Sequence, residues 1–124
     1  YGLKKDEIRK RTIKALEQVG LKDKLRCFPD DLAGGEQQSV SIARAIVNDP
    51  KVLICDEPTG NLDPKLSMEI MEIIDKINKE LGTTIIMATH DQTIVNKMKK
   101  RVVALDKGTI VKDVQKGKYI SESI

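Results

Sequence analysis

The sequence has no tryptophan, two tyrosines and one phenylalanine. So few rings cannot build a stacking platform for single-stranded nucleic acid, which needs several exposed aromatic side chains. The charge also argues against nucleic-acid binding, because 22 basic and 19 acidic residues leave a net charge of only +3. One basic cluster, KMKKR at 97–101, is typical of a helix end whose positive charge suits the helix dipole, with contact to a partner or an acidic membrane surface as the alternative. We expect no nucleic-acid partner.

Cysteine is also scarce. Cys27 and Cys55 are too few for a disulfide framework and are not spaced like a pair of metal ligands, so reduced thiols in a cytoplasmic protein fit them best. No apolar run approaches the roughly 18 residues of a membrane span. The first residues carry no apolar stretch of a secretory signal and do not begin with methionine. We therefore expect the 124 residues to be part of something longer.

The pattern of apolar residues predicts an α/β protein. Two helices come first, over 6–19 with Asp6 as the cap, and over about 35–48 with Val40, Ala43 and Val47 as the buried stripe. Val52–Cys55 is then a continuous apolar run, as expected for a central parallel strand that is buried on both faces.

A crossover unit follows this strand. Asp63 is expected to cap a helix that starts at Pro64 and ends before Gly82, and 83–89 is the next β-rich run. A strand, a long helix and a second strand in this order predict parallel pairing. A short helix at 91–98 and a β-hairpin over 101–114 complete the pattern, and the polar tail from Gln115 is expected to be loose.

Several residues lie where chemistry is expected. In LAGGEQQSVSIARA, residues 32–45, two glycines precede a helix, a layout that brings backbone N–H groups up to a phosphate. Asp56 and Glu57 follow the buried strand, at the edge where α/β sheets bind their ligands. His90 is the only histidine and emerges after the second strand at the same edge. Asp63, in GNLD, suits a helix cap with or without a further role.

One motif is missing. A lysine-bearing phosphate loop, G-x-x-x-x-G-K-[ST], does not occur anywhere in the sequence.

Together these segments resemble the ATP-binding-cassette (ABC) ATPases. LAGGEQQSVSIARA is similar to their signature motif, VLICDEP to the Walker B strand, GNLD to the D-loop and ATHD to the switch-histidine loop, in the same order. The resemblance runs from about residue 2 to 114 and is stronger to the bacterial cell-division members than to the lipoprotein-releasing and macrolide-export members. It implies ATP and Mg²⁺ as cofactors.

The resemblance also implies roles for single residues. Asp56 would hold Mg²⁺, Glu57 would act as general base on the attacking water, and His90 would contact the γ-phosphate. In this family two nucleotide-binding domains pair head to tail, so other residues would serve the ATP of the second domain. These residues are Ala33, Gly34, Gly35 and Glu36 of the signature and Asp63 of the D-loop.

In the family the phosphate loop lies before the part that this chain resembles. The resemblance therefore implies the C-terminal half of a P-loop NTPase domain, with a helical subdomain at 1–50, the later part of the ATPase core at 51–124, and the N-terminal half as a missing partner. The phosphate-loop strand would lie between the strands at 83–89 and 101–106. Without it we expect a gap in the sheet, and a chain that is unstable or that associates with itself or a complementary half.

Two positions depart from the family pattern. Serine is usual where this chain has Ala33, and arginine is common where it has Ser39. A hydrogen bond from the serine hydroxyl to a charged phosphate is worth roughly 1.5–3 kcal/mol, so hydrolysis at that site is expected to fall by about ten- to a hundredfold. The change from arginine removes a cation with no role that the sequence reveals.

Three functions remain open. The first is an ATPase of bacterial cell division that is coupled to an integral membrane partner, cytoplasmic and peripheral on the inner face of the membrane. The second is the ATPase of an exporter or lipoprotein-releasing system. The third is a non-catalytic fragment or dimerisation module that binds no nucleotide alone, which the missing phosphate loop favours for this chain.

Overall fold

A computed structural model describes residues 2–115. The chain divides into two compact units, 1–88 and 89–124, which are described one at a time. Of the tail expected to be loose from Gln115 onward, residues 116–124 lie outside the described residues. No helix in the described part is both long and apolar enough to cross a membrane.

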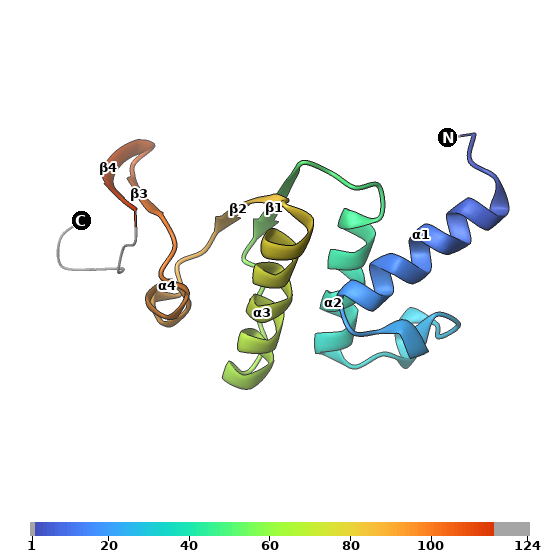
Figure 1. The fold of residues 1–124 in the computed structure, drawn as a ribbon. Helices are drawn as coiled ribbons and strands as arrows, with labels where there is room; N and C mark the ends of the chain where they lie inside the picture. Colours follow the sequence, from blue (N-terminus) through green and yellow to red (C-terminus); the bar gives the residue numbers. More distant parts are fainter. Residues whose placement is uncertain (1, 116–124) are drawn as a thin grey trace. The chain divides into compact units, whose positions relative to one another are not determined.

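The first unit begins with helices α1 (Lys5–Gln18) and α2 (Gly34–Ile46), which pack on each other (Figure 1). The short 3₁₀ turns η1 (Lys22–Lys24) and η2 (Pro29–Asp31) connect them. Helix α1 starts one residue earlier than expected, so Lys4 is its N-cap and the prediction of Asp6 is wrong. Leu16 of this helix and Val19, its C-cap residue, are buried.

The buried stripe of α2 differs from the expected one. Of the predicted residues only Ala43 is buried, whereas Val40 and Val47 are partly exposed. The other buried residues of this helix are Gly35, Ser39, Ile42 and Ile46. The true stripe begins with a glycine and a serine, so hydrophobicity alone does not reveal it.

Strands β1 (Val52–Asp56) and β2 (Thr84–Ala88) pair in parallel, with Val52 opposite Thr84 and Asp56 opposite Ala88. Helix α3 (Pro64–Leu81) connects them, which confirms the predicted crossover unit. Asp63 caps this helix with its side chain, and Gly82 ends it in the left-handed conformation with φ of 69°.

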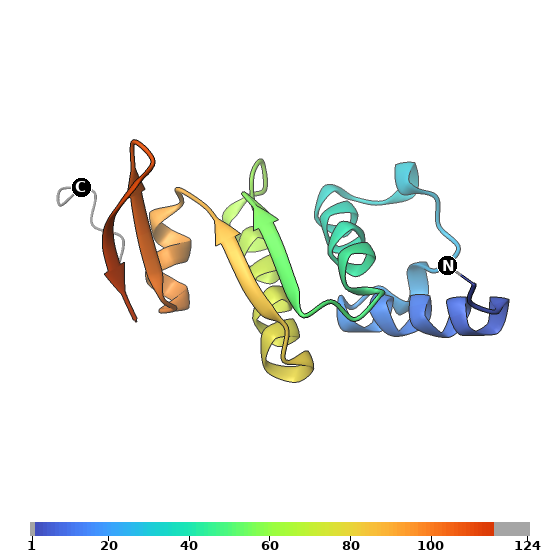
Figure 2. The same cartoon turned by 90° about the horizontal axis from the view of Figure 1, so that it is seen from above.

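Helix α3 covers one face of the β1–β2 sheet (Figure 2). Leu53 and Cys55 point to this side and are buried, and α3 contributes the two most deeply buried side chains, Ile70 and Ile77. Burial raises the pKa of the Cys55 thiol.

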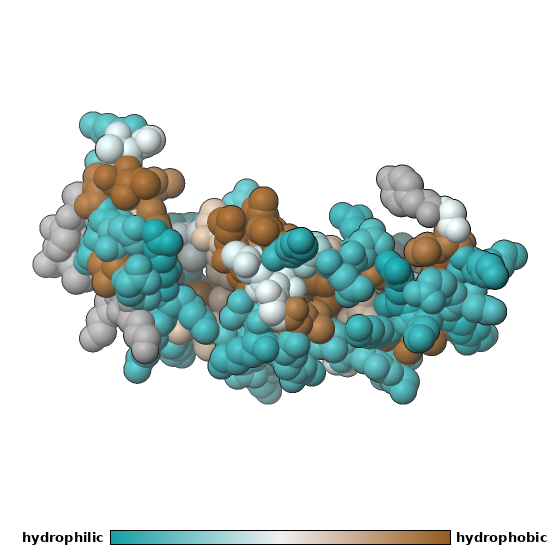
Figure 3. Space-filling model, turned by 45° about the horizontal axis from the view of Figure 1, so that its top comes forward, coloured by the Kyte–Doolittle hydropathy of each residue, from teal (hydrophilic) through white to brown (hydrophobic). Residues whose placement is uncertain are grey.

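The other face of the same sheet is open. Val52, Ile54 and Ile86 are 47, 74 and 55% exposed. Apolar surface gathers over β1 and β2 in Figure 3. The expectation of a strand buried on both faces is therefore wrong for this chain, because α3 packs on one face of the sheet and these three residues on the other face are exposed. We refer to Val52, Ile54 and Ile86 below as the open face.

The second unit contains α4 (Gln92–Met98), capped by Asp91, and the hairpin of β3 (Val102–Asp106) and β4 (Thr109–Val114). Lys107 and Gly108 form the two-residue turn with φ of 49° and 78°, the left-handed pair that such turns require. Arg101 holds Asp113 with two hydrogen bonds of 2.9 and 2.7 Å, which lower the pKa of that carboxyl group. The strands of the described residues thus form two sheets, β1–β2 in the first unit and β3–β4 in the second.

Candidate functional site

The first candidate segment is the start of α2. Ala33 occupies the N-cap position but has no side-chain oxygen with which to cap the helix. The Glu36 carboxylate instead accepts a hydrogen bond from the Ala33 N–H at 3.1 Å, and Lys24 Nζ lies 3.9 Å from its other oxygen. Two charges of opposite sign therefore lie beside this helix start.

The two glycines of the segment have different surroundings. At Gly34 an added Cβ would meet nothing within 4 Å, so the backbone is open to an approaching group. At Gly35 the same atom would lie 3.1 Å from a methyl carbon of Leu66 in α3, closer than ordinary packing allows. Gly34 thus fits the predicted approach to a phosphate, while Gly35 is also needed for the packing of α2 on α3.

Asp56 and Glu57 lie where the sequence predicted them, at the carboxyl end of β1. Asp56 is exposed. Glu57 is partly buried and has a φ of 46°, a left-handed conformation that is uncommon for residues other than glycine, asparagine and aspartate. Its N–H donates to Ala88 of β2 at 2.8 Å and its carbonyl accepts from Gly60 at 3.0 Å. The backbone around the two carboxylates is therefore tightly fixed.

Asp63 is the N-cap of α3. Its Oδ1 accepts a hydrogen bond from the Leu66 N–H at 2.9 Å, and the side chain is exposed. This confirms the capping role, and leaves the side chain accessible for a contact with another molecule.

His90 belongs to the second unit, two residues after the end of β2, and is exposed. Beside it the Asp91 N–H donates to the Thr89 hydroxyl at 3.1 Å, and Asp91 caps α4. The grouping of His90 with Asp56 and Glu57 stays a prediction.

Gln38 makes a contact that its sequence context does not predict. Its side-chain amide donates to the carbonyl oxygen of Pro58 at 2.8 Å, across 20 positions of the chain. Together with the contact between Gly35 and Leu66, this bond places the start of α2 beside the turn that follows β1 and the start of α3. A polar residue on a helix carries no signal of such a partner, which only the fold brings near.

The carboxylates suit a magnesium ion only in part. No cluster of three or more metal-ligating side chains occurs between residues 2 and 115. Mg²⁺ commonly takes one or two carboxylates and fills its remaining positions with water and substrate phosphate oxygens. A single exposed carboxylate at a strand end, Asp56, fits that pattern, with Glu57 next to it.

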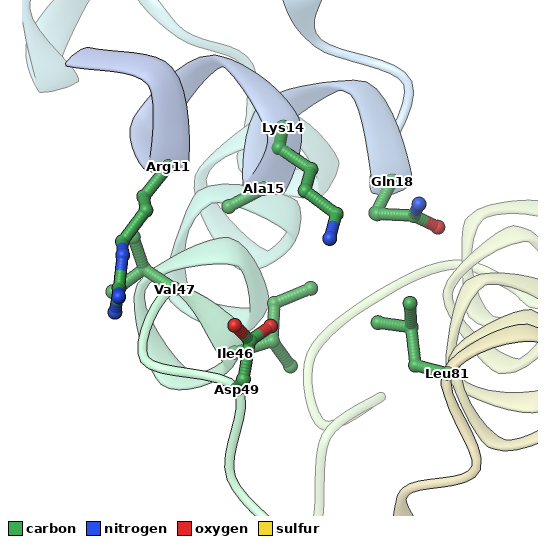
Figure 4. A pocket seen from close by; sticks show the side chains of 8 residues that line it. All are labelled: Arg11, Lys14, Ala15, Gln18, Ile46, Val47, Asp49 and Leu81. Carbon is green, nitrogen blue, oxygen red and sulfur yellow. The ribbon is translucent and has the colours of Figure 1, made fainter. Parts of the chain in front are cut away.

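A small hollow lies elsewhere in the first unit, between α1, the end of α2 and the last residue of α3 (Figure 4). Its volume of about 20 Å³ holds little more than one water molecule. Lys14, Gln18 and Asp49 line it, and none of the predicted site residues does. It is too small for a nucleotide.

The profile of the ABC transporter family matches residues 3–60. FtsE, the cell-division ATP-binding protein of Streptococcus pneumoniae, is 55% identical over 118 residues, which are 95% of this chain and 51% of that protein. FtsE of Bacillus subtilis is 58% identical over 112 residues, 90% of this chain and 49% of that protein. MetN, the methionine import ATP-binding protein of Carboxydothermus hydrogenoformans, is 42% identical over 112 residues, 90% of this chain and 33% of that protein.

Solved structures agree with the sequence relatives. CbiO1 of Clostridium perfringens, described as part of the ABC transporter complex cbiONQ, superposes with a TM-score of 0.85 at 41% identity, over 91% of this chain and 45% of that one. The dimeric structure of MJ0796, a bacterial ABC transporter cassette, gives a TM-score of 0.75 at 32% identity, over 96% of this chain and 51% of that one.

The chain belongs to the ATP-binding-cassette family of ATPases. Its relatives of 55 and 58% identity are cell-division ATP-binding proteins of the FtsE type, and the chain spans about half the length of these curated relatives.

Proposed function

We propose that the chain is the second half of the nucleotide-binding domain of a cell-division ABC ATPase. In the complete domain, ATP hydrolysis acts on an integral membrane partner of the FtsX type, and the protein is cytoplasmic and peripheral on the inner face of the membrane. The observation that carries this proposal is the match to FtsE over 95% of the chain, with Asp56 and Glu57 at the carboxyl end of β1. The import ATPase MetN at 42% identity keeps a transport role as the second candidate.

Three residues would serve the ATP of their own domain. Asp56 would hold Mg²⁺, which supplies neutralisation of phosphate charge when bound. Glu57 would accept the proton of the attacking water, and its fixed backbone supports this role because a general base must be accurately positioned. His90 would donate a hydrogen bond to the γ-phosphate.

Another set would serve the ATP of a second domain, paired head to tail as two cassettes. The start of α2 offers backbone N–H groups and the positive end of a 13-residue helix. The open backbone at Gly34 and the accessible carboxylate of Asp63 support this arrangement. The residues of this set are Ala33, Gly34, Gly35, Glu36 and Asp63.

The phosphate loop must come from the other half of the domain, which the chain does not contain. The open face supports this part of the proposal, because parallel sheets are normally covered on both sides. We further propose that this half covers Val52, Ile54 and Ile86, and that the chain alone is a non-catalytic module.

A calorimetric titration tests the half-domain proposal. Mg-ATP is titrated into the 124-residue chain, and then into the chain co-purified with the first half of Bacillus subtilis FtsE. We expect no binding to the chain alone and stoichiometric binding to the assembly. Stoichiometric binding to the chain alone would mean that it builds a phosphate site without a phosphate loop.

Glu57→Gln tests the general base. In the assembled domain this change should abolish turnover while ATP stays bound, because the amide no longer accepts a proton. Glu69→Gln, at an exposed position of α3, is the matched control. Turnover retained in the Glu57 variant removes that residue as the base.

Ala33→Ser tests the altered signature. The serine hydroxyl restores a hydrogen bond to charged phosphate worth roughly 1.5–3 kcal/mol, so turnover of the assembled domain should rise by about ten- to a hundredfold. Steady-state ATPase assays at saturating ATP measure the change. Equal turnover of the two forms would discard this account of Ala33.

A further inference from the structure

The side chain of Gln38 connects α2 to the turn that follows β1. Its Nε2 donates to the Pro58 carbonyl oxygen over 2.8 Å. Pro58 is buried and Gln38 is partly buried, so water competes little for this bond. Pro58 directly follows Glu57, so the bond restrains the residue next to the one that carries the carboxylate.

The Glu57 backbone needs such support. A residue other than glycine at φ of 46° is strained, and a strained conformation persists only where its surroundings hold it. Ala88 of β2 and Gly60 of the turn each make one backbone hydrogen bond with Glu57. Gln38 adds a restraint on the next residue, and this one comes from α2.

A second contact fixes α2 one turn earlier. Gly35 has no side chain, and Leu66 packs closely on it. A Cβ added at Gly35 would lie 3.1 Å from a methyl carbon of Leu66, which is too close for ordinary packing. The first two turns of α2 are thus held to both the Glu57–Gly60 turn and the start of α3. Displacement of the helix start would disturb the Glu57 turn.

We propose that Gln38 is a positioning residue that couples the start of α2 to Glu57. This inference rests on the proposed function, in which the start of α2 meets the ATP of the second domain and Glu57 serves the ATP of its own domain. When the start of α2 contacts the phosphate of the second domain's ATP, it then also fixes the position of the Glu57 carboxylate at the ATP of its own domain. The two sites of a dimer are thereby coupled through each chain by one side-chain hydrogen bond.

Gln38→Met tests the coupling, since methionine keeps the length of the side chain and removes the amide donor. Gln37→Met is the matched control, because the Gln37 amide donates at 3.1 Å to Leu32 of its own segment. Both variants are prepared in the assembly with the first half of Bacillus subtilis FtsE, or in the chain alone where no assembly forms.

Amide hydrogen exchange gives the first readout. The Gly60 N–H, which donates to Glu57, should exchange about three- to tenfold faster in Gln38→Met, the equivalent of one neutral hydrogen bond, and should not change in Gln37→Met. The Ile74 amide in the middle of α3 should keep its rate. Unchanged exchange at Gly60 overturns the proposal, and so does equal acceleration at Gly60 and Ile74, which would indicate a general loss of stability.

Turnover of the assembly gives the second readout. Gln38→Met should lower kcat by about three- to tenfold and leave the KM for ATP unchanged, because ATP binding does not use this bond. If the Gly60 amide exchanges faster but kcat is unchanged, Gln38 restrains the turn but does not couple it to catalysis, and the proposed coupling is wrong. An unmodified assembly that folds but lacks turnover contradicts the proposed function instead, and hydrogen exchange then still decides whether Gln38 holds the turn.

Discussion

The two faces of the β1–β2 sheet differ in their surroundings although they alternate along the same strand. On one face Leu53 is 5% exposed under α3, while on the other Ile54, its neighbour in the chain, is 74% exposed. Both side chains are aliphatic and of similar size. An apolar residue in a strand therefore indicates that its side chain needs burial. Only the fold shows whether another part of the same chain covers it.

Alanine substitutions at Leu53 and Ile54 compare the contributions of the two faces to stability directly. In the chain alone, Leu53→Ala should lower the free energy of unfolding by about 2–5 kcal/mol, because it leaves a cavity against α3. Ile54→Ala should change it by less than about 0.5 kcal/mol, as exposed substitutions do. Urea unfolding followed by circular dichroism measures both values. Equal losses would show that the open face is covered as well.

The complementary half should remove the difference between the faces. If it covers the open face, Ile54→Ala should weaken its binding by about 1.5–3 kcal/mol, roughly ten- to 150-fold in Kd, because a buried isoleucine side chain contributes that much. Glu72→Ala, on an exposed position of α3, serves as the control. Calorimetric titration of one half into the other compares the variants. An Ile54 variant that binds like the unchanged chain places the contact elsewhere.

Thiol labelling compares a cysteine on the covered face with one on the surface. The expected difference is smaller than those above. Cys55 lies on the covered face and burial raises its pKa, whereas Cys27 is exposed. A raised pKa reduces the reactive thiolate, so at pH 8 Cys55 should be labelled at least about tenfold more slowly than Cys27. Mass spectrometry of the labelled chain follows both sites.

The same shift has a consequence for stability at high pH. Because the folded pKa of Cys55 lies above its unfolded value, the stability it contributes is complete below the unfolded pKa of about 8.5 and decreases as the pH rises toward the folded value. Cys55→Ser should remove this part of the pH dependence, while Cys27→Ser should leave it in place. Urea unfolding at pH 7 and pH 10 provides the check.

The sequence predicted those parts of the fold that depend on local signals. The Asp63 cap, Pro64 at the first position of α3 and the end of the helix at Gly82 are all as expected, since capping needs only residues a few positions apart. The parallel crossover and the β-hairpin followed from apolar patterning and turn chemistry in the same way.

Tertiary neighbours were not predictable. Gly35 and Ser39 begin the buried stripe of α2, where they carry no hydrophobic signal, and the packing of Leu66 and α1 decides which face is inside. The bond from Gln38 to Pro58 joins residues that no local pattern relates. For the candidate site, the placement of Asp56 and Glu57 at a strand end was predictable, but the left-handed backbone of Glu57 was not.

That left-handed residue has a consequence for selection and design. Glycine adopts the conformation without strain, so Glu57→Gly would relieve roughly 1–3 kcal/mol of backbone strain. A library screened only for folding or solubility would therefore favour the loss of this carboxylate early. Redesign of the chain for expression should hold Glu57 fixed and seek its stability gains at positions away from the end of β1.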